Sequence, residues 1–156
     1  MRDKRFIAEH RGGFLRKEQH RQLMNWACIC AEHVFPLLIE KTDERLLNTL
    51  FIAREWAKGK TKAGDAMKAS LSSHAVARHS SDPVVIAVAR ATGHAAATAH
   101  MADHSMGASL YALKAVRNAG KSTDSERKWQ NEQLPAEIKE LVLNGRREKE
   151  KHFMIG

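Results

Sequence analysis

Apolar side chains recur every three or four positions over most of the chain, which is the spacing of one face of an α-helix. The clearest stripe consists of Leu23, Ala27, Cys30 and Val34. It predicts a core helix from Lys17 onward. Pro36 is expected to end or kink this helix, because proline lacks the backbone N–H that a helix interior needs.

Capping residues predict where the next helices begin and end. Asp43 is a good N-cap for a second helix, and Gly59 is placed to end it. Thr61 is expected to cap a third helix, which the polar run at 80–82 ends. Pro83 then favours a new start, because proline is tolerated at the first helical position.

Residues 83–119 are rich in alanine. Small side chains allow helix backbones to approach closely, so two helices at the centre of the fold are predicted here. The break between them is expected between Ala99 and Ser105. Further on, Ser122 can cap a short helix that holds Trp129, and a last helix is predicted from Pro135 to Leu143.

These elements predict an all-α fold, a compact bundle of antiparallel helical hairpins with six to seven helices. We expect a basic N-terminal arm at 1–16, a single helical domain at 17–143 and a charged C-terminal tail at 144–156. The arm carries apolar residues that can dock it, namely Phe6, Ile7, Phe14 and Leu15.

Composition agrees with a globular protein that remains outside membranes. Of 156 residues, 43% are hydrophobic and 28% are charged, and no apolar run approaches the roughly 20 residues of a membrane span. A cytoplasmic location is therefore expected. Cys28 and Cys30 would point about 200° apart on one helix, so they cannot pair with each other there, and burial is expected for both.

The net charge of +8 is compatible with a nucleic-acid partner, an acidic protein partner or a well-solvated surface. Most basic residues are interleaved with acidic ones, so charge alone does not choose among these. Arg54 and Arg90 lie near apolar stripes and would need carboxylate partners if they are buried.

A group of histidines is the main candidate for chemistry: His94, His100 and His104, with Asp103 beside the last. His100 and His104 are four residues apart and would share a helix face, the spacing with which two imidazoles can bind one metal ion. A bend between them would remove that face, and the sequence alone cannot complete the set of ligands that a metal site needs. A structural role at helix ends is therefore favoured over a metal or catalytic role.

All three tryptophans fall on or beside apolar stripes, which favours core positions, and Trp129 is the best candidate among them for an exposed anchor at a protein interface. With its neighbours Gln130 and Asn131, and with the histidine group, it makes up the expected partner-binding residues.

The chain resembles the immunity-five-like family of immunity proteins between about residues 5 and 143. The resemblance rests on the segments Arg11-Gly-Gly13, Lys17-Glu-Gln-His-Arg21, Trp26-Ala-Cys28, Cys30-Ala-Glu-His33, Ala89-Arg-Ala91, Gly93-His94, Ala97-Thr-Ala-His100, Tyr111-Ala112 and Glu126-Arg-Lys-Trp-Gln-Asn-Glu-Gln-Leu-Pro135.

This resemblance implies a small helical protein that neutralises a toxin by binding it, with no catalytic residues and no cofactor. Because the chain is basic, the toxin is expected to present an acidic contact surface. Two alternatives stay open: a nucleic-acid-binding helical module, indicated by the charge and the basic arm, and a metal-binding enzyme that uses His94, His100 and His104.

Overall fold

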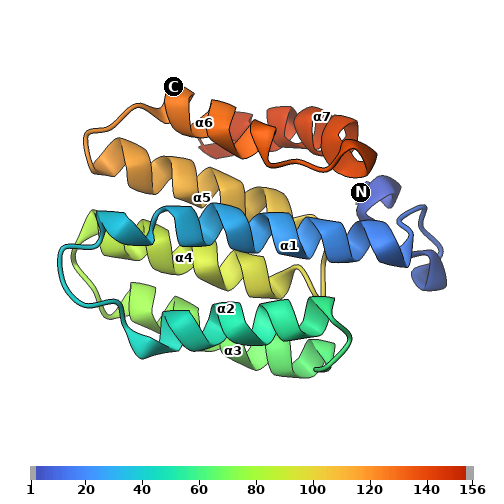
Figure 1. Cartoon of the computed structure of the whole chain (residues 1–156), viewed down its shortest axis with the longest axis horizontal. Coiled ribbons are helices and arrows are strands. Elements are labelled where there is room, and N and C mark those ends of the chain that lie inside the picture. The colour runs from blue at the N-terminus through green and yellow to red at the C-terminus, as the bar shows by residue number, and fades with distance from the viewer. Residues whose placement is uncertain (1–2, 154–156) are drawn as a thin grey trace.

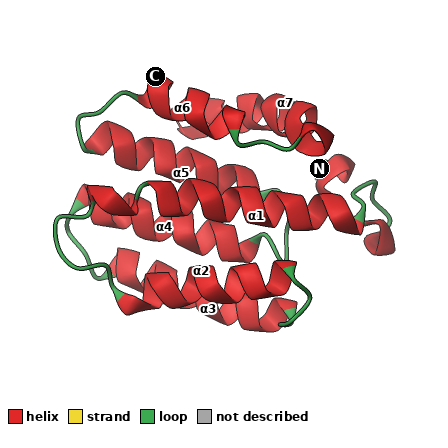
Figure 2. Cartoon of the chain, viewed as in Figure 1, coloured by secondary structure: helices red, strands yellow, loops and turns green. Residues whose placement is uncertain are grey.

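The computed structural model describes residues 3–153, with side chains as far as Lys151. Seven α-helices and three 3-10 helices occur in this part of the chain, and its one β-type pairing is an isolated bridge between Ala8 and Leu15. Figure 2 shows helices joined by short loops throughout. The expected all-α fold and the number of helices are confirmed.

The α-helices are α1 (Lys17–His33), α2 (Glu44–Ala57), α3 (Ala63–Arg78), α4 (Pro83–Ala97), α5 (His104–Asn118), α6 (Thr123–Glu132) and α7 (Ala136–Phe153). The 3-10 helices are η1 (Lys4–Phe6), η2 (Glu9–Arg11) and η3 (Phe35–Leu37). In Figure 1, α2 and α3 form one outer layer, α6 and α7 form the other, and α1, α4 and α5 lie between them. No helix within residues 3–153 has the length and apolarity to cross a membrane.

Helix α4 is at the centre, packed against α1, α2, α3 and α5. Its inner side and that of α5 consist largely of alanines that are completely buried, among them Ala91, Ala95, Ala108 and Ala112. This confirms the prediction that the alanine-rich segment is central, since side chains of one carbon let neighbouring helices approach closely.

Most of the expected helix ends are confirmed. The Asp43 carboxylate accepts a hydrogen bond from the Arg45 N–H, the Ser122 hydroxyl accepts one from the Ser125 N–H, and Gly59 adopts a φ of 78° after α2. The prediction that Thr61 caps the third helix is wrong. The N-cap of α3 is the next residue, and the Thr61 hydroxyl donates to the Ile52 carbonyl at 3.4 Å instead.

The prediction that the last helix ends at Leu143 is also wrong. Helix α7 continues past Leu143 and Gly145 through to Phe153, so residues expected as tail form three further turns. A Cβ on Gly145 would lie 2.7 Å from the Met106 sulfur and 3.0 Å from the Phe6 ring. The glycine therefore allows α7 to pack closely and does not end it. Residues 154–156 lie outside the described part.

The N-terminal arm docks onto the end of the bundle. Phe6 and Leu15 are buried, whereas Phe14 is 70% exposed. The chain reverses at Gly12, which has a φ of 88°, and the Leu15 N–H then donates to the Ile7 carbonyl at 2.9 Å. Docking of the arm covers one end of α1 and, as shown below, encloses a cavity.

Both cysteines are buried and free on α1. Burial raises the pKa of the Cys28 thiol to about 12 and raises the pKa of Cys30 as well, because a thiolate is poorly solvated in the core. Their predicted role as small core residues is confirmed.

Candidate functional site: a basic pocket and a buried histidine cluster

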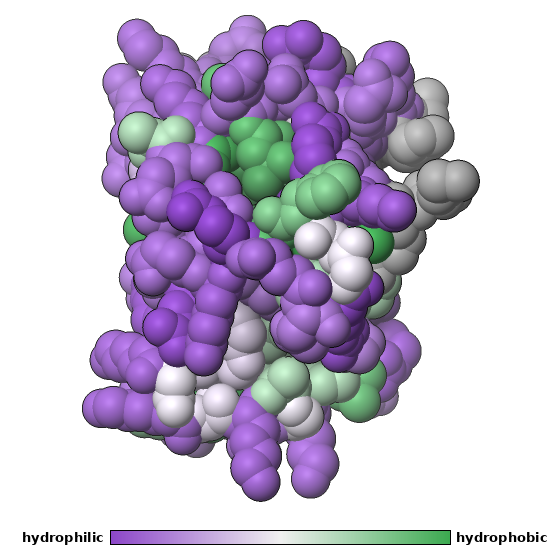
Figure 3. Space-filling view, turned by 90° about the vertical axis from the view of Figure 1, so that its right-hand side faces the viewer, coloured by the Kyte–Doolittle hydropathy of each residue, from purple (hydrophilic) through white to green (hydrophobic). Residues whose placement is uncertain are grey.

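A cavity of about 620 Å³ lies at the end of the bundle where the arm meets α1, the last turn of α2, the start of α3 and the turn between α4 and α5. Figure 3 views this end, which is mostly hydrophilic around a small apolar area. The lining is Phe6, Ile7, Ala8, Glu9, His10, Arg11, Leu15, Lys17, His20, Arg21, Trp56, Ala63, Ala99, His100, Met101 and Ala102. We call this cavity the end pocket.

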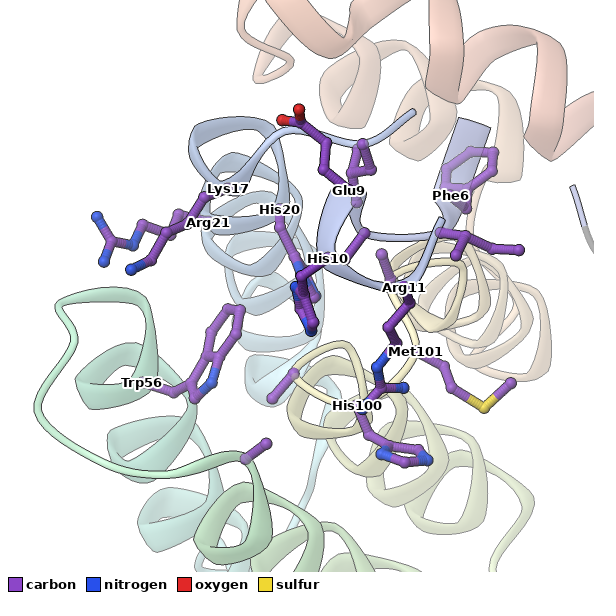
Figure 4. A pocket seen from close by; sticks show the side chains of 16 residues that line it. Phe6, Glu9, His10, Arg11, Lys17, His20, Arg21, Trp56, His100 and Met101 are labelled. Atoms are coloured by element: carbon purple, nitrogen blue, oxygen red, sulfur yellow. The ribbon is translucent and has the colours of Figure 1, made fainter. Parts of the chain in front are cut away.

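The end pocket is rich in positive charge. Arg11, Lys17 and Arg21 line it, and no carboxylate of residues 3–151 forms an ion pair with any of the three. Glu9 is the one acidic residue of the lining, and Figure 4 shows its carboxylate turned away from the imidazoles of His10 and His20. The pocket therefore has a positive potential that the protein itself does not neutralise.

His20 and Trp56 form the aromatic side of the end pocket, with ring centroids 4.8 Å apart. The Nε2–H of His20 donates to the Thr98 carbonyl at 2.5 Å, which requires the proton to be on Nε2. Burial lowers the pKa of His20; the bond to Thr98 opposes this effect, and the charges of His10 and Arg11 reinforce it. The ring is therefore a neutral, fixed part of the wall.

A second group of polar side chains lies inside the bundle between α3, α4 and α5. His94 Nδ1 is 2.8 Å from His104 Nδ1, and the His94 ring stacks on Tyr111 with centroids 5.1 Å apart. The His74 ring meets the His94 ring edge-on, with centroids 5.4 Å apart. The His74 Nδ1 accepts a hydrogen bond from Arg90 at 2.7 Å. We call these five residues the histidine cluster.

Burial keeps His94 and His74 neutral. It lowers the pKa of His94 to about 3, and the nearby His104 and His74 reinforce the shift. It also lowers the pKa of His74 to about 4, together with the charge of Arg90. Within the described residues, no group of three or more His, Cys, Asp or Glu side chains is arranged to hold a metal ion.

The structure separates the histidines that the sequence placed on one helix face. His100 lies in the turn after α4, is exposed and lines the end pocket, whereas His104 is the first residue of α5 and points to His94. The prediction that His100 and His104 share a helix face is therefore wrong, because the chain turns between them. Asp103 lies beside Lys149, with Oδ2 and Nζ 3.9 Å apart.

Trp129 is half-buried on α6 and stacks on His33 of α1, with centroids 3.4 Å apart and an interplanar angle of 8°. His33 is held in turn by Glu126, whose Oε2 is 2.6 Å from the His33 Nδ1. One face of the indole is thus covered by the protein, and the ring is fixed in orientation.

The neighbours of Trp129 hold the bundle together. Gln130 is completely buried. Its backbone carbonyl accepts a hydrogen bond from the Trp26 indole at 2.9 Å. Its side-chain amide donates to the Ser109 carbonyl at 3.0 Å, and its side-chain Oε1 accepts from Arg146 at 2.9 Å. Asn131 is half-buried and also accepts from Arg146. The expectation that Gln130 contacts a partner is corrected, since three internal bonds keep it in the core.

The two arginines near apolar stripes are paired differently. Arg54 forms two hydrogen bonds to the Glu32 carboxylate, at 3.0 and 3.2 Å, as expected. Arg90 has His74 as its hydrogen-bond acceptor in place of a carboxylate.

Sequence reasoning missed His74 as a member of the histidine cluster, although two helix glycines carry a signal. A Cβ on Gly93 would lie 2.7 Å from the His74 ring, and a Cβ on Gly107 would lie 2.9 Å from His94 Nδ1. A glycine inside a helix costs stability relative to alanine, so its presence indicates that a side chain from another helix needs the space.

The comparison with known families matches residues 13–137 to the model described as Imm-5 like putative immunity protein. The chain belongs to this family. No curated protein and no solved structure matches the chain. The matched region spans α1 to α6 and the first residues of α7, so it contains both the histidine cluster and most of the residues around the end pocket.

Proposed function

We propose that this protein neutralises a cognate toxin by binding it, without catalysis. The observation that carries this proposal is the family match over residues 13–137. Neutralisation by binding requires that the protein occupies a surface of the toxin, and affinity then comes from a few well-placed anchors and from charge complementarity.

The toxin contact is proposed to include Trp129 and the exposed positions beside it on α6. A half-exposed indole that is already held by His33 loses little conformational freedom when a partner covers its edge. Aromatic side chains of this sort carry much of the energy of protein interfaces. Asn131 lies two residues further along the helix, where it lines a shallow surface hollow with Lys128.

Charge supports an acidic contact surface on the toxin. The chain carries a net charge of +8, and Lys128 is exposed next to Trp129. An acidic partner is attracted to such a surface over several ångströms, and this attraction weakens when salt shortens the screening length.

The test uses a toxin-domain protein from the genes that neighbour this one, where the proposal expects such a gene. Its expression alone should arrest growth, and co-expression with this chain should restore growth. The purified pair should form a complex, with a dissociation constant that rises between 50 and 300 mM NaCl. Trp129→Ala should weaken the complex at least about tenfold, as expected for a central aromatic anchor.

Phe51→Ala is the matched control, because Phe51 is also an exposed aromatic residue but lies on α2. It should leave affinity unchanged, and circular dichroism should confirm that both variants fold. Absence of both rescue and complex would overturn the proposal. Binding of nucleic acid at low salt, without a toxin complex, would favour the nucleic-acid-binding alternative instead.

A further inference from the structure

We propose that the end pocket is a binding site for a small phosphate monoester that carries an aromatic ring, the chemistry of a nucleoside monophosphate. This inference goes beyond toxin binding and does not rest on it, because the pocket shares no residue with α6. Its volume of about 620 Å³ lies within the range of roughly 300–1,000 Å³ that is common for small-molecule sites.

The charge of the lining points to a dianion. Arg11, Lys17 and Arg21 provide three positive charges without a carboxylate partner among residues 3–151, and Glu9 provides one negative charge. Two positive charges are therefore left in excess, apart from the histidines. A phosphate monoester at neutral pH carries a charge between about −1.5 and −2, whereas a carboxylate carries −1 and would leave part of this excess unbalanced.

The helix ends add to the positive potential. Lys17 and Ala63 are the first residues of α1 and α3, and both line the end pocket. The partial positive charge at a helix N-terminus favours an anion nearby. Guanidinium groups such as those of Arg11 and Arg21 also match the geometry of phosphate oxygens with paired N–H donors.

The aromatic side of the pocket points to a ring on the ligand. Trp56 is half-buried and lies against His20, and Figure 4 shows the Lys17 and Arg21 side chains extending outward from α1 above Trp56. Leu15, Ala99 and Ala102 provide apolar surface beside them. A planar base can stack on an aromatic side chain while its phosphate reaches the cations.

Titration calorimetry with the full chain at pH 7 tests this site, with adenosine 5′-monophosphate as the probe. We expect one molecule to bind per chain, at least about tenfold more tightly than adenosine or inorganic phosphate. Adenosine lacks the phosphate that the cations would bind, and inorganic phosphate lacks the base that would stack on the aromatic wall. In NMR spectra, the indole N–H signal of Trp56 should shift. The pKa of His20 should rise, since the bound anion offsets the charges that now help to lower it.

Lys17→Glu and Arg21→Glu should each weaken binding of the monophosphate at least about tenfold. Lys17→Glu suits the fold, because an acidic residue is favourable in the first turn of a helix. Lys121→Glu makes the same change of charge at the opposite end of the bundle (Figure 1), in the turn before α6, and should leave affinity within about twofold.

Three results would overturn the inference. The first is binding of the monophosphate no tighter than that of inorganic phosphate. The second is an equal loss in Lys121→Glu, which would indicate attraction by net charge alone. The third is tighter binding of a single-stranded oligonucleotide without a terminal phosphate, or of an acidic peptide, than of the monophosphate.

Discussion

Mild acid is expected to destabilise the protein through its histidine cluster. His94 and His74 have pKa values of about 3 and about 4 in the folded protein, below the ordinary value of 6.5, because burial disfavours the charged imidazole. The unfolded chain therefore binds more protons than the folded chain when the pH is below 6.5. The contribution of these histidines to the free energy of unfolding is fully present above that pH, and it is lost as the pH decreases toward the folded pKa values.

The magnitude follows from the two pKa differences. At pH 5 an unfolded histidine is mostly protonated, while His94 and His74 stay mostly neutral in the folded state. The gap of about 1.5 pH units from the ordinary pKa corresponds to about 2 kcal/mol for each residue. Because the two rings interact and are partly accessible, the loss in unfolding free energy between pH 8 and pH 5 should total about 2–4 kcal/mol.

Urea unfolding at pH 8, 7, 6 and 5, followed by circular dichroism, measures this loss. The range stops at pH 5 so that carboxylates with lowered pKa values, such as Asp3 and Asp43, do not contribute. The double variant His74→Gln/His94→Gln should show a flatter profile, and the slope that remains is assigned to His20, whose pKa burial also lowers. His79→Gln, which changes an exposed histidine at the end of α3, should keep the parent profile. An unfolding free energy that is constant from pH 8 to pH 5 would refute the reasoning.

Four substitutions test the packing. Gly107→Ala should lower the free energy of unfolding by about 1–3 kcal/mol, because its Cβ would lie 2.9 Å from the His94 Nδ1. Gly64→Ala is the control, since its Cβ would have no atom within 4 Å, and it should leave the free energy of unfolding unchanged or raise it by up to about 1 kcal/mol. Gln130→Ala should cost about 2–4 kcal/mol in urea unfolding, since it removes the two buried hydrogen bonds of the side chain, one to the Ser109 carbonyl and one from Arg146, while the backbone carbonyl still accepts from Trp26. Leu110→Ala should cost about 3 kcal/mol by leaving a cavity in a completely buried position, and a midpoint unchanged in thermal unfolding would contradict this.

Part of the candidate site could be predicted from the sequence. The sequence names Trp129 as a candidate for an exposed anchor, and the residue is half-buried on α6. The sequence groups His94 and His104 with His100 as one candidate set, and the Nδ1 atoms of His94 and His104 are 2.8 Å apart. Their partner His74 comes from another helix, 20 residues earlier in the chain, and no spacing rule connects it to them. The end pocket was not predicted, because parts of the chain as far apart as the N-terminal arm and the turn between α4 and α5 enclose it.

What the sequence determined by itself is the order of the helices and most of their ends. Stripes of apolar residues and caps such as Asp43, Gly59 and Ser122 act through neighbours within about four residues, so they can be read without the fold. The central position of the alanine-rich segment follows from the same local information, since small side chains are favoured where helices approach most closely.

The tertiary structure alone decided which polar residues enter the core. Arg146 lies in a segment that is charged throughout, yet it is 3% exposed, because Gln130 and Asn131 accept its N–H groups and Trp26 lies beneath its guanidinium. Gly145 looks like the end of a helix, yet α7 runs through it. In each case the deciding energy comes from contacts with residues far away in the sequence, and these contacts exist only after the helices have packed.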